Sequence, residues 1–159
     1  MHGICGYHFC EKLTRRRCAA CESEWYCDRN CQRSSWGLHK FACVGRKNAF
    51  TTGDILYRAC YVDLPPLEHA ETMADFGFYR AGTREEQNKL LGVYEFCVIL
   101  CGMQAKNLQY WRVKGILVQE IQKLYLVVPV DSRANLSYVW FRRNMWVFDG
   151  KTSEERVWE

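Results

Sequence analysis

Residues 18–43 read CAACESEWYCDRNCQRSSWGLHKFAC and hold five cysteines and one histidine. Their spacing is C-x2-C-x5-C-x3-C-x7-H-x3-C. Cys5 and Cys10 lie upstream and bring the set of candidate metal ligands to eight. Thiolate and imidazole are the ligands of structural zinc, and each such ion takes four of them in a tetrahedron. The sequence therefore predicts two structural zinc sites near the amino terminus.

The spacing also indicates which ligands share an ion. Cys18 and Cys21 are separated by two residues, which lets the chain turn and direct two thiolates at one metal. Two pairs have an offset of four, which places their side chains on one face of a helix; they are Cys27 with Cys31 and His39 with Cys43. In a cross-braced arrangement, the first and third pairs along the chain hold one ion, and the second and fourth pairs hold the other. We therefore expect one site from Cys5, Cys10, Cys27 and Cys31, and the other from Cys18, Cys21, His39 and Cys43.

The last six ligands resemble those of the MYND-type zinc finger family. The resemblance includes the residues around them, which are Trp25-Tyr26-Cys27, Cys31-Gln32, Trp36 and His39-Lys40. The chain departs from the commonest family pattern at its start, where Cys5-x4-Cys10 stands in place of a C-x2-C pair. His8 lies between these two cysteines and is an alternative ligand to either one. We favour the two cysteines, because thiolate is the stronger zinc ligand.

The resemblance implies a binding site for a short peptide. In MYND fingers, the positions that match Gln32 and Trp36 border a shallow groove that takes up extended, proline-containing segments. The two residues are four apart, so they share a face of the predicted helix. An indole can pack against a polyproline-like strand, and Gln offers an amide to its backbone. The alternative is that Trp36 forms the small core of the zinc module, and the two interpretations are compatible.

The formal charge of the chain is +4, and all of this excess lies near the amino terminus. Residues 1–46 carry eight Lys or Arg against four Asp or Glu, whereas the remainder carries 14 of each sign. Arg15, Arg16 and Arg17 precede the first knuckle and offer contacts to phosphates. Nucleic-acid binding through these arginines is therefore the rival function. A run of three without interleaved aromatic residues is more often a solvated face.

The pattern beyond residue 50 predicts helices. In the finger itself we expect two short helices, one from about Arg29 and one from Ser35 to His39. Further along, apolar residues recur at helical spacing in four segments, which are Thr52–Val62, Leu67–Phe76, Thr83–Cys101 and Asn107–Tyr125. Gly92 and Gly115 lie inside the last two segments, where a close helix crossing or chance would account for them. Residues 137–148 are compatible with a strand, a helix or an extended arm.

The expected fold is therefore α-rich with a small zinc-stabilised module. We assign residues 1–46 to a cross-braced, two-zinc MYND-like finger, residues 52–149 to an α-helical domain and residues 150–159 to a polar tail. Segments of the helical part resemble a group of fungal MYND-containing proteins of unassigned activity. They are Asp75-Phe76-Gly77-Phe78, Thr83–Tyr94 and Tyr138–Asp149.

We expect a binding protein and predict no catalytic residues. Catalytic zinc keeps an open position, whereas both predicted sites fill with four ligands. Some MYND fingers lie within SET-type methyltransferases, but no cofactor-binding motif of that family follows here. The first ten residues contain no apolar signal segment, and no apolar run approaches the roughly 18 residues of a membrane span. We thus expect an intracellular protein, nuclear or cytoplasmic, with two zinc ions as cofactors. Its expected partner is another protein, bound through a short extended peptide, with no membrane and no small-molecule substrate.

Overall fold

The computed structural model describes residues 1–46, 49–134 and 137–156. The chain divides into two compact units, Met1–Ala49 and Phe50–Glu159. Within the described residues, no helix combines the length and the apolar character needed to cross a membrane.

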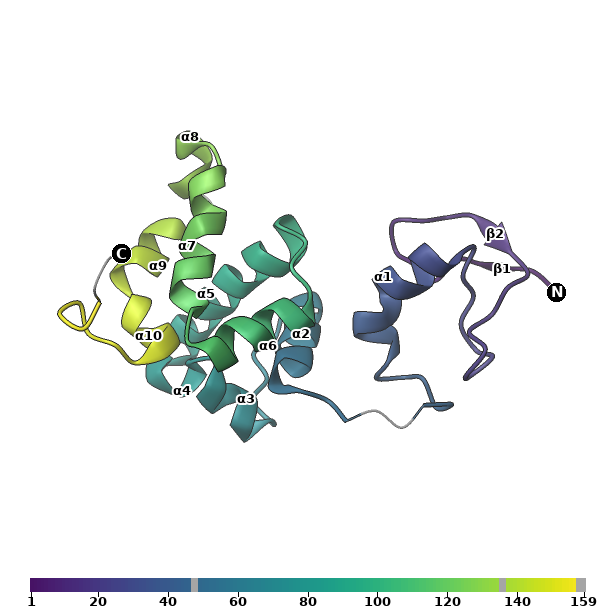
Figure 1. The fold of residues 1–159 in the computed structure, drawn as a ribbon, viewed down its shortest axis with the longest axis horizontal. Helices are drawn as coiled ribbons and strands as arrows, with labels where there is room; N and C mark the ends of the chain where they lie inside the picture. Colours follow the sequence, from purple (N-terminus) through teal and green to yellow (C-terminus); the bar gives the residue numbers. More distant parts are fainter. Residues whose placement is uncertain (47–48, 135–136, 157–159) are drawn as a thin grey trace. The chain divides into compact units, whose positions relative to one another are not determined.

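The first unit contains a small antiparallel ribbon and one helix (Figure 1). Strands β1 (Gly3–Ile4) and β2 (Leu13–Thr14) pair with Gly3 opposite Thr14, and Arg17 forms an isolated bridge with Trp25. Helix α1 (Arg29–His39) begins after Asp28, whose side chain accepts a hydrogen bond from the Cys31 amide at 2.8 Å. The expectation of two short helices was wrong. Gly37 leaves α1 unbroken, because a single glycine in a helix costs only about 1 kcal/mol.

The candidate zinc ligands themselves form most of the core of this unit. Among its described residues, the buried apolar side chains are three cysteines and Tyr26. Tyr7 and Trp36 pack against this cluster while remaining partly exposed. So small an apolar core contributes little to stability, and the unit must depend on what the cysteines bind.

The second unit is helical, as expected, and Figure 1 follows it from α2 to the yellow α10. Its elements are α2 (Thr52–Val62), α3 (Ala70–Asp75), α4 (Phe78–Ala81), α5 (Arg84–Glu95), the π-helical turn η1 (Phe96–Leu100), α6 (Ala105–Lys114), α7 (Leu117–Val127), α8 (Val130–Arg133), α9 (Tyr138–Arg143) and α10 (Met145–Asp149). Helix α2 packs against α3, α5 and α6, while α10 packs against α4 and α7. Residues 137–148, for which three conformations were open, contain the two helices α9 and α10.

Aromatic side chains fill the core of the second unit. The ring of Tyr94 lies 5.5–6.0 Å from the rings of Phe76, Phe78 and Phe148. Its hydroxyl donates a hydrogen bond of 2.8 Å to the Phe76 carbonyl. Each of these four side chains is at most 1% exposed. This unit has a metal-independent core, in contrast to the first.

Two of the expected helical segments are divided in the structure. The segment Asn107–Tyr125 is two helices, because Gly115 ends α6 in the left-handed conformation at φ 68°. A Cβ on Gly115 would meet no atom within 4 Å, so of the two interpretations left open for this glycine, a close helix crossing does not apply. At Gly92 the nearest atom is 3.5 Å away, which is an ordinary contact. The segment Thr83–Cys101 divides into α5 and η1, and Gly102, at φ 71°, follows it.

Candidate metal centres and the hollow beside them

The structure brings together the first group of four cysteines. Cys5 follows β1, Cys10 follows the next turn, and Cys27 and Cys31 flank the start of α1. Their sulfur atoms all lie within 4.8 Å of one another. The Cys10 and Cys27 sulfurs are 3.7 Å apart, and those of Cys27 and Cys31 are 3.5 Å apart.

The second group gathers at the other end of α1. His39 lies in the last turn of this helix, and Cys43 follows it in the next turn of the chain. The sulfurs of Cys18 and Cys43 are 4.0 Å apart, and His39 Nε2 lies 3.5 Å from the Cys21 sulfur. All four ligand atoms lie within 4.8 Å of one another.

Both groups fit a tetrahedral zinc ion. With zinc–sulfur bonds of about 2.3 Å, the edge of a tetrahedron between two sulfurs is about 3.8 Å. The three sulfur–sulfur separations of 3.5, 3.7 and 4.0 Å scatter around that value. They are far longer than a disulfide bond of about 2.05 Å, and all ten cysteines are free. The donor atoms thus have the chemistry and the spacing for one zinc ion in each group.

His8, the alternative ligand of the first group, belongs to neither cluster. Its ring lies 4.0 Å from the ring of Phe9 and is exposed. The two cysteines that flank it occupy the ligand positions. The irregular Cys5-x4-Cys10 spacing is accommodated by a turn, in which the Cys10 amide donates to the Tyr7 carbonyl at 2.7 Å.

A hydrogen bond beside the second cluster favours the charged form of one candidate ligand, Cys21. The Ser23 hydroxyl donates to the Cys21 sulfur at 3.0 Å and is the main reason why the pKa of Cys21 falls to about 6. The Cys31 amide lowers the pKa of Asp28 in the same way, by donating to its carboxylate. A lowered thiol pKa favours the thiolate, which is the form that binds zinc.

The thiolates change the charge of the finger. Two Zn²⁺ ions carry four positive charges, and seven cysteine thiolates carry seven negative ones, a net of minus three. Residues 1–46 have an excess of four positive side chains, which leaves a formal charge of plus one with zinc bound. The basic excess thus largely offsets the metal clusters, and the finger as a whole is not strongly basic.

A hollow of about 450 Å³ lies between the first knuckle and α1. It is lined by Cys18, Ala19, Ala20, Arg29, Gln32, Arg33, Trp36 and Arg46. The two residues predicted to bind a peptide, Gln32 and Trp36, are both part of its wall. Trp36 also packs against the ligand cluster and lies edge-on to His39 at 5.8 Å. It is therefore part of the small core and of the hollow at once.

Three arginines complete the hollow, and the sequence analysis did not single them out. Arg29 and Arg33 lie three residues before Gln32 and Trp36, respectively, on the same face of α1. The helical periodicity was a signal that could have found them. Arg46 lies beyond the second cluster, with its guanidinium 5.3 Å from the Trp36 ring centroid. Its place depends on Gly45, where a Cβ would lie only 1.5 Å from the Ala20 carbonyl oxygen.

Two of the three arginines on which the alternative of nucleic-acid binding depends contact other residues of the first unit. The Arg17 guanidinium lies 4.1 Å from the Trp25 ring centroid and donates to the Glu22 carbonyl. Arg15 donates to the ring of His2. Only Arg16 of the three has no side-chain contact among the described residues. These contacts leave less of the run available to phosphates than the sequence indicates.

Two cysteines outside the clusters and His69 have structural surroundings in the second unit. Cys60 and Cys97 are buried in the second unit, and burial raises the pKa of both thiols. His69 caps α3, where its Nδ1 accepts a hydrogen bond from the Thr72 amide at 3.2 Å. Neither cysteine belongs to a metal cluster among the described residues.

Comparisons with known proteins concern the first unit. Residues 5–43 match the family model described as MYND finger. The chain is 38% identical over 40 residues to N-lysine methyltransferase SMYD2-B of Danio rerio, which is 25% of this chain and 9% of that protein. It is 46% identical over 33 residues to SET domain and MYND-type zinc finger protein 6 of Schizosaccharomyces pombe, which is 21% of this chain and 7% of that protein. No solved structure matches the chain.

The similarity to these relatives thus spans less than a tenth of their length, and the activity that their names state is theirs. The family match covers all eight residues of the two clusters. The clusters are of the kind that bind zinc in this family, and its fingers are protein-interaction modules. Residues 5–43 of this chain are therefore similar to the MYND finger family, and the similarity is confined to this part of the chain.

Proposed function

We propose that the chain is a zinc-stabilised binding protein whose finger takes up a short extended peptide in the hollow beside α1. One zinc ion is held by Cys5, Cys10, Cys27 and Cys31, and the other by Cys18, Cys21, His39 and Cys43. Each ion then has four protein ligands and no open position, so both ions are structural and not catalytic. The protein binds its partner and performs no reaction on it.

The observation that carries the proposal is the composition of the hollow. A half-buried indole from Trp36 offers an apolar face, and Gln32 lies one helical turn before it. The side-chain amide of Gln32 makes no hydrogen bond among the described residues, so it is free to pair with the backbone of an incoming strand. A flat aromatic surface next to an amide is the chemistry that recognises a polyproline-like segment.

The arginines that line the hollow indicate which residues should flank the apolar or proline residue of the bound peptide. Arg29, Arg33 and Arg46 line it, and among the described residues no carboxylate does. Although the finger as a whole is nearly neutral with zinc bound, positive charge is concentrated at this point. We therefore infer that the preferred peptide carries Asp or Glu beside its apolar or proline residue. Arginine and carboxylate form strong, bidentate hydrogen bonds when such a peptide binds.

An array of synthetic, proline-containing peptides with acidic, neutral or basic flanks tests the proposal on the full chain. We expect acidic flanks to bind best, and Trp36→Ala to lose binding by tenfold or more, as is usual for an aromatic anchor. Arg33→Gln should reduce the preference for acidic flanks. Tyr110→Ala removes an exposed aromatic ring from the second unit and should bind as the wild type does.

The metal content distinguishes a variant that has lost only the binding groove from a variant that has lost its fold. Native mass spectrometry should find two zinc ions in Trp36→Ala, and Gln32→Ala provides a second variant whose side chain is not part of the core. If both variants hold two zinc ions and bind the peptides with wild-type affinity, the hollow is not the binding site.

A further inference from the structure

The second unit contains a cationic pocket that has no part in the finger. It has a volume of about 370 Å³ and lies where α7, α9, α10 and the segment after α10 meet. The residues that matter here are Gln122 of α7, Arg142 and Arg143 of α9, Trp146 of α10, and Lys151 and Arg156. Four of these six carry a positive charge, and no carboxylate of the described residues lines the pocket.

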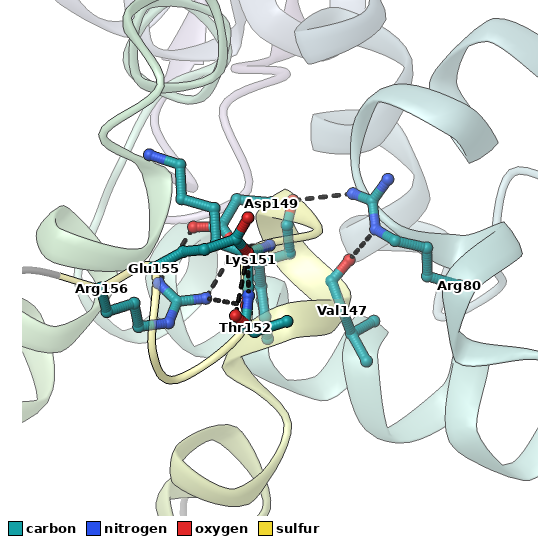
Figure 2. Close-up of polar contacts among 8 residues, drawn as sticks. Arg80, Val147, Asp149, Lys151, Thr152, Glu155 and Arg156 are labelled. Atoms are coloured by element: carbon teal, nitrogen blue, oxygen red, sulfur yellow. Dashed lines mark hydrogen bonds and ion pairs between the residues drawn. The ribbon is translucent and has the colours of Figure 1, made fainter.

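Hydrogen bonds hold the wall of this pocket in place (Figure 2). Arg156 donates to both carboxylate oxygens of Asp149, at 2.7 and 3.0 Å, and its side chain is only 8% exposed. Arg80 binds the end of α10, donating to the Val147 and Phe148 carbonyls at 2.7 and 2.9 Å. Residues 150–156, assigned to a polar tail from the sequence, are thereby folded back onto α10. The pocket is a fixed feature and not the edge of a loose tail.

The cations of the pocket are not equally available to a ligand. Asp149 neutralises Arg156, so Arg156 shapes the wall. Lys151 lies near Glu155, whose pKa is lowered by hydrogen bonds from Thr152 and, to a smaller extent, by the charge of Lys151.

Arg142 and Arg143 differ from these two cations. Neither has a carboxylate partner among the described residues, although Arg142 lies 6.0 Å from the Tyr138 ring centroid. Two adjacent arginines without counter-charges form a site for a strong anion, and the guanidinium group matches phosphate geometry.

Trp146 indicates the chemistry of the part of the ligand that does not contact the arginines. It lies in the wall of the pocket, and 47% of its surface is exposed, which is unusual for a residue of such apolar area. An exposed indole beside arginines is a stacking surface for a flat, polar ring. The amide of Gln122 offers hydrogen bonds to the edge of such a ring. A volume of 370 Å³ lies at the small end of the range for ligand pockets.

We propose that this pocket binds a nucleotide, with its terminal phosphate on Arg142 and Arg143 and its base against Trp146. The required chemistry is a phosphate monoester joined to a flat ring. A free nucleotide and the phosphorylated end of a nucleic-acid strand share that chemistry. The pocket is separate from the peptide site of the finger, so the two proposals stand or fall independently.

Adenosine 5′-monophosphate is the probe, added to the zinc-loaded full chain. The readout is the indole N–H resonance of Trp146, assigned by its disappearance in Trp146→Phe. We expect this resonance to shift with the nucleotide, and not with adenosine, which lacks the phosphate. Arg142→Gln/Arg143→Gln should weaken binding at least tenfold, because it removes both charged donors on which the phosphate is placed. Arg84→Gln, which removes an exposed charge outside the pocket, should bind as the wild type does.

Three results would overturn the proposal. They are no shift of Trp146 at millimolar nucleotide, an equal affinity in the double variant, and the same shift with inorganic phosphate alone. If the double variant fails to fold, Arg143→Gln alone replaces it, since that side chain makes no hydrogen bond or ion pair among the described residues. A 5′-phosphorylated trinucleotide distinguishes the two sources. If this trinucleotide binds, the ligand of the pocket is the phosphorylated end of a nucleic-acid strand. If it does not bind, the ligand is the free nucleotide.

Discussion

Removal of zinc should unfold the first unit and leave the second unit folded. Among the described residues of the first unit, Tyr26 is the one buried apolar side chain that is not a cysteine. Burial of such a side chain contributes about 2–3 kcal/mol, whereas one structural zinc ion contributes on the order of 10 kcal/mol. The loss of either ion therefore exceeds what the apolar core supplies. In the second unit, packed aromatic rings such as Tyr94 and Phe148 need no metal.

The assay is a titration of the full chain with a zinc chelator, followed by amide NMR spectra and native mass spectrometry. We expect the finger resonances to lose their dispersion as two zinc ions leave, while those of the second unit keep theirs. Cys18→Ala should bind less than two equivalents, because Cys18 is buried within the second cluster. Cys101→Ser changes a cysteine outside both clusters and should retain two zinc ions. A finger that stays dispersed after complete metal removal would refute the reasoning.

Two further predictions concern the second unit. Gly77→Ala should lower the free energy of unfolding of the second unit by more than Gly82→Ala does. Both glycines have φ near 80°, but only a Cβ on Gly77 would lie 2.0 Å from a carbonyl oxygen of α10. Gly82→Ala should cost about 1–2 kcal/mol, the conformational part alone, as measured by urea unfolding. Burial and, to a smaller extent, Asp63 raise the pKa of Glu95 to about 7. Stability from protonated Glu95 is therefore full below about pH 4.5 and is lost as the pH rises through 7. Thermal unfolding of Glu95→Gln should show a smaller loss between about pH 4.5 and 7, and that of Glu68→Gln, an exposed control, should match the wild type.

The ligand pattern in the sequence was enough to group the metal residues. A knuckle such as Cys18–Cys21 and an offset of four such as His39–Cys43 are local geometry, which the chain fixes within a few residues. Gln32 and Trp36 could be placed together for the same reason, because they share a face of one helix. Apolar periodicity likewise predicted that the second unit is helical.

Packing between distant segments could not be derived from these local patterns. The π-helical turn η1 and the break at Gly115 depend on how the helices end against one another, and periodicity alone does not mark such ends. The sequence also gave no preference between strand and helix for residues 137–148, because aromatic and β-branched residues suit both when buried.

Residue spacing was thus enough to group the candidate zinc ligands and to predict the helical character of the second unit, whereas the groove role of Gln32 and Trp36 remains a prediction from the family resemblance. Only the tertiary structure placed Arg46 over Trp36, since this requires the close approach of Gly45 to the first knuckle. Only the tertiary structure joined Arg142 and Arg143 to Trp146 in one pocket, because Asp149 and Arg156 fold the last described residues back onto α10. Residue spacing determines the relative positions of side chains that are neighbours along one helix or knuckle. A surface made from several segments forms only after those segments pack.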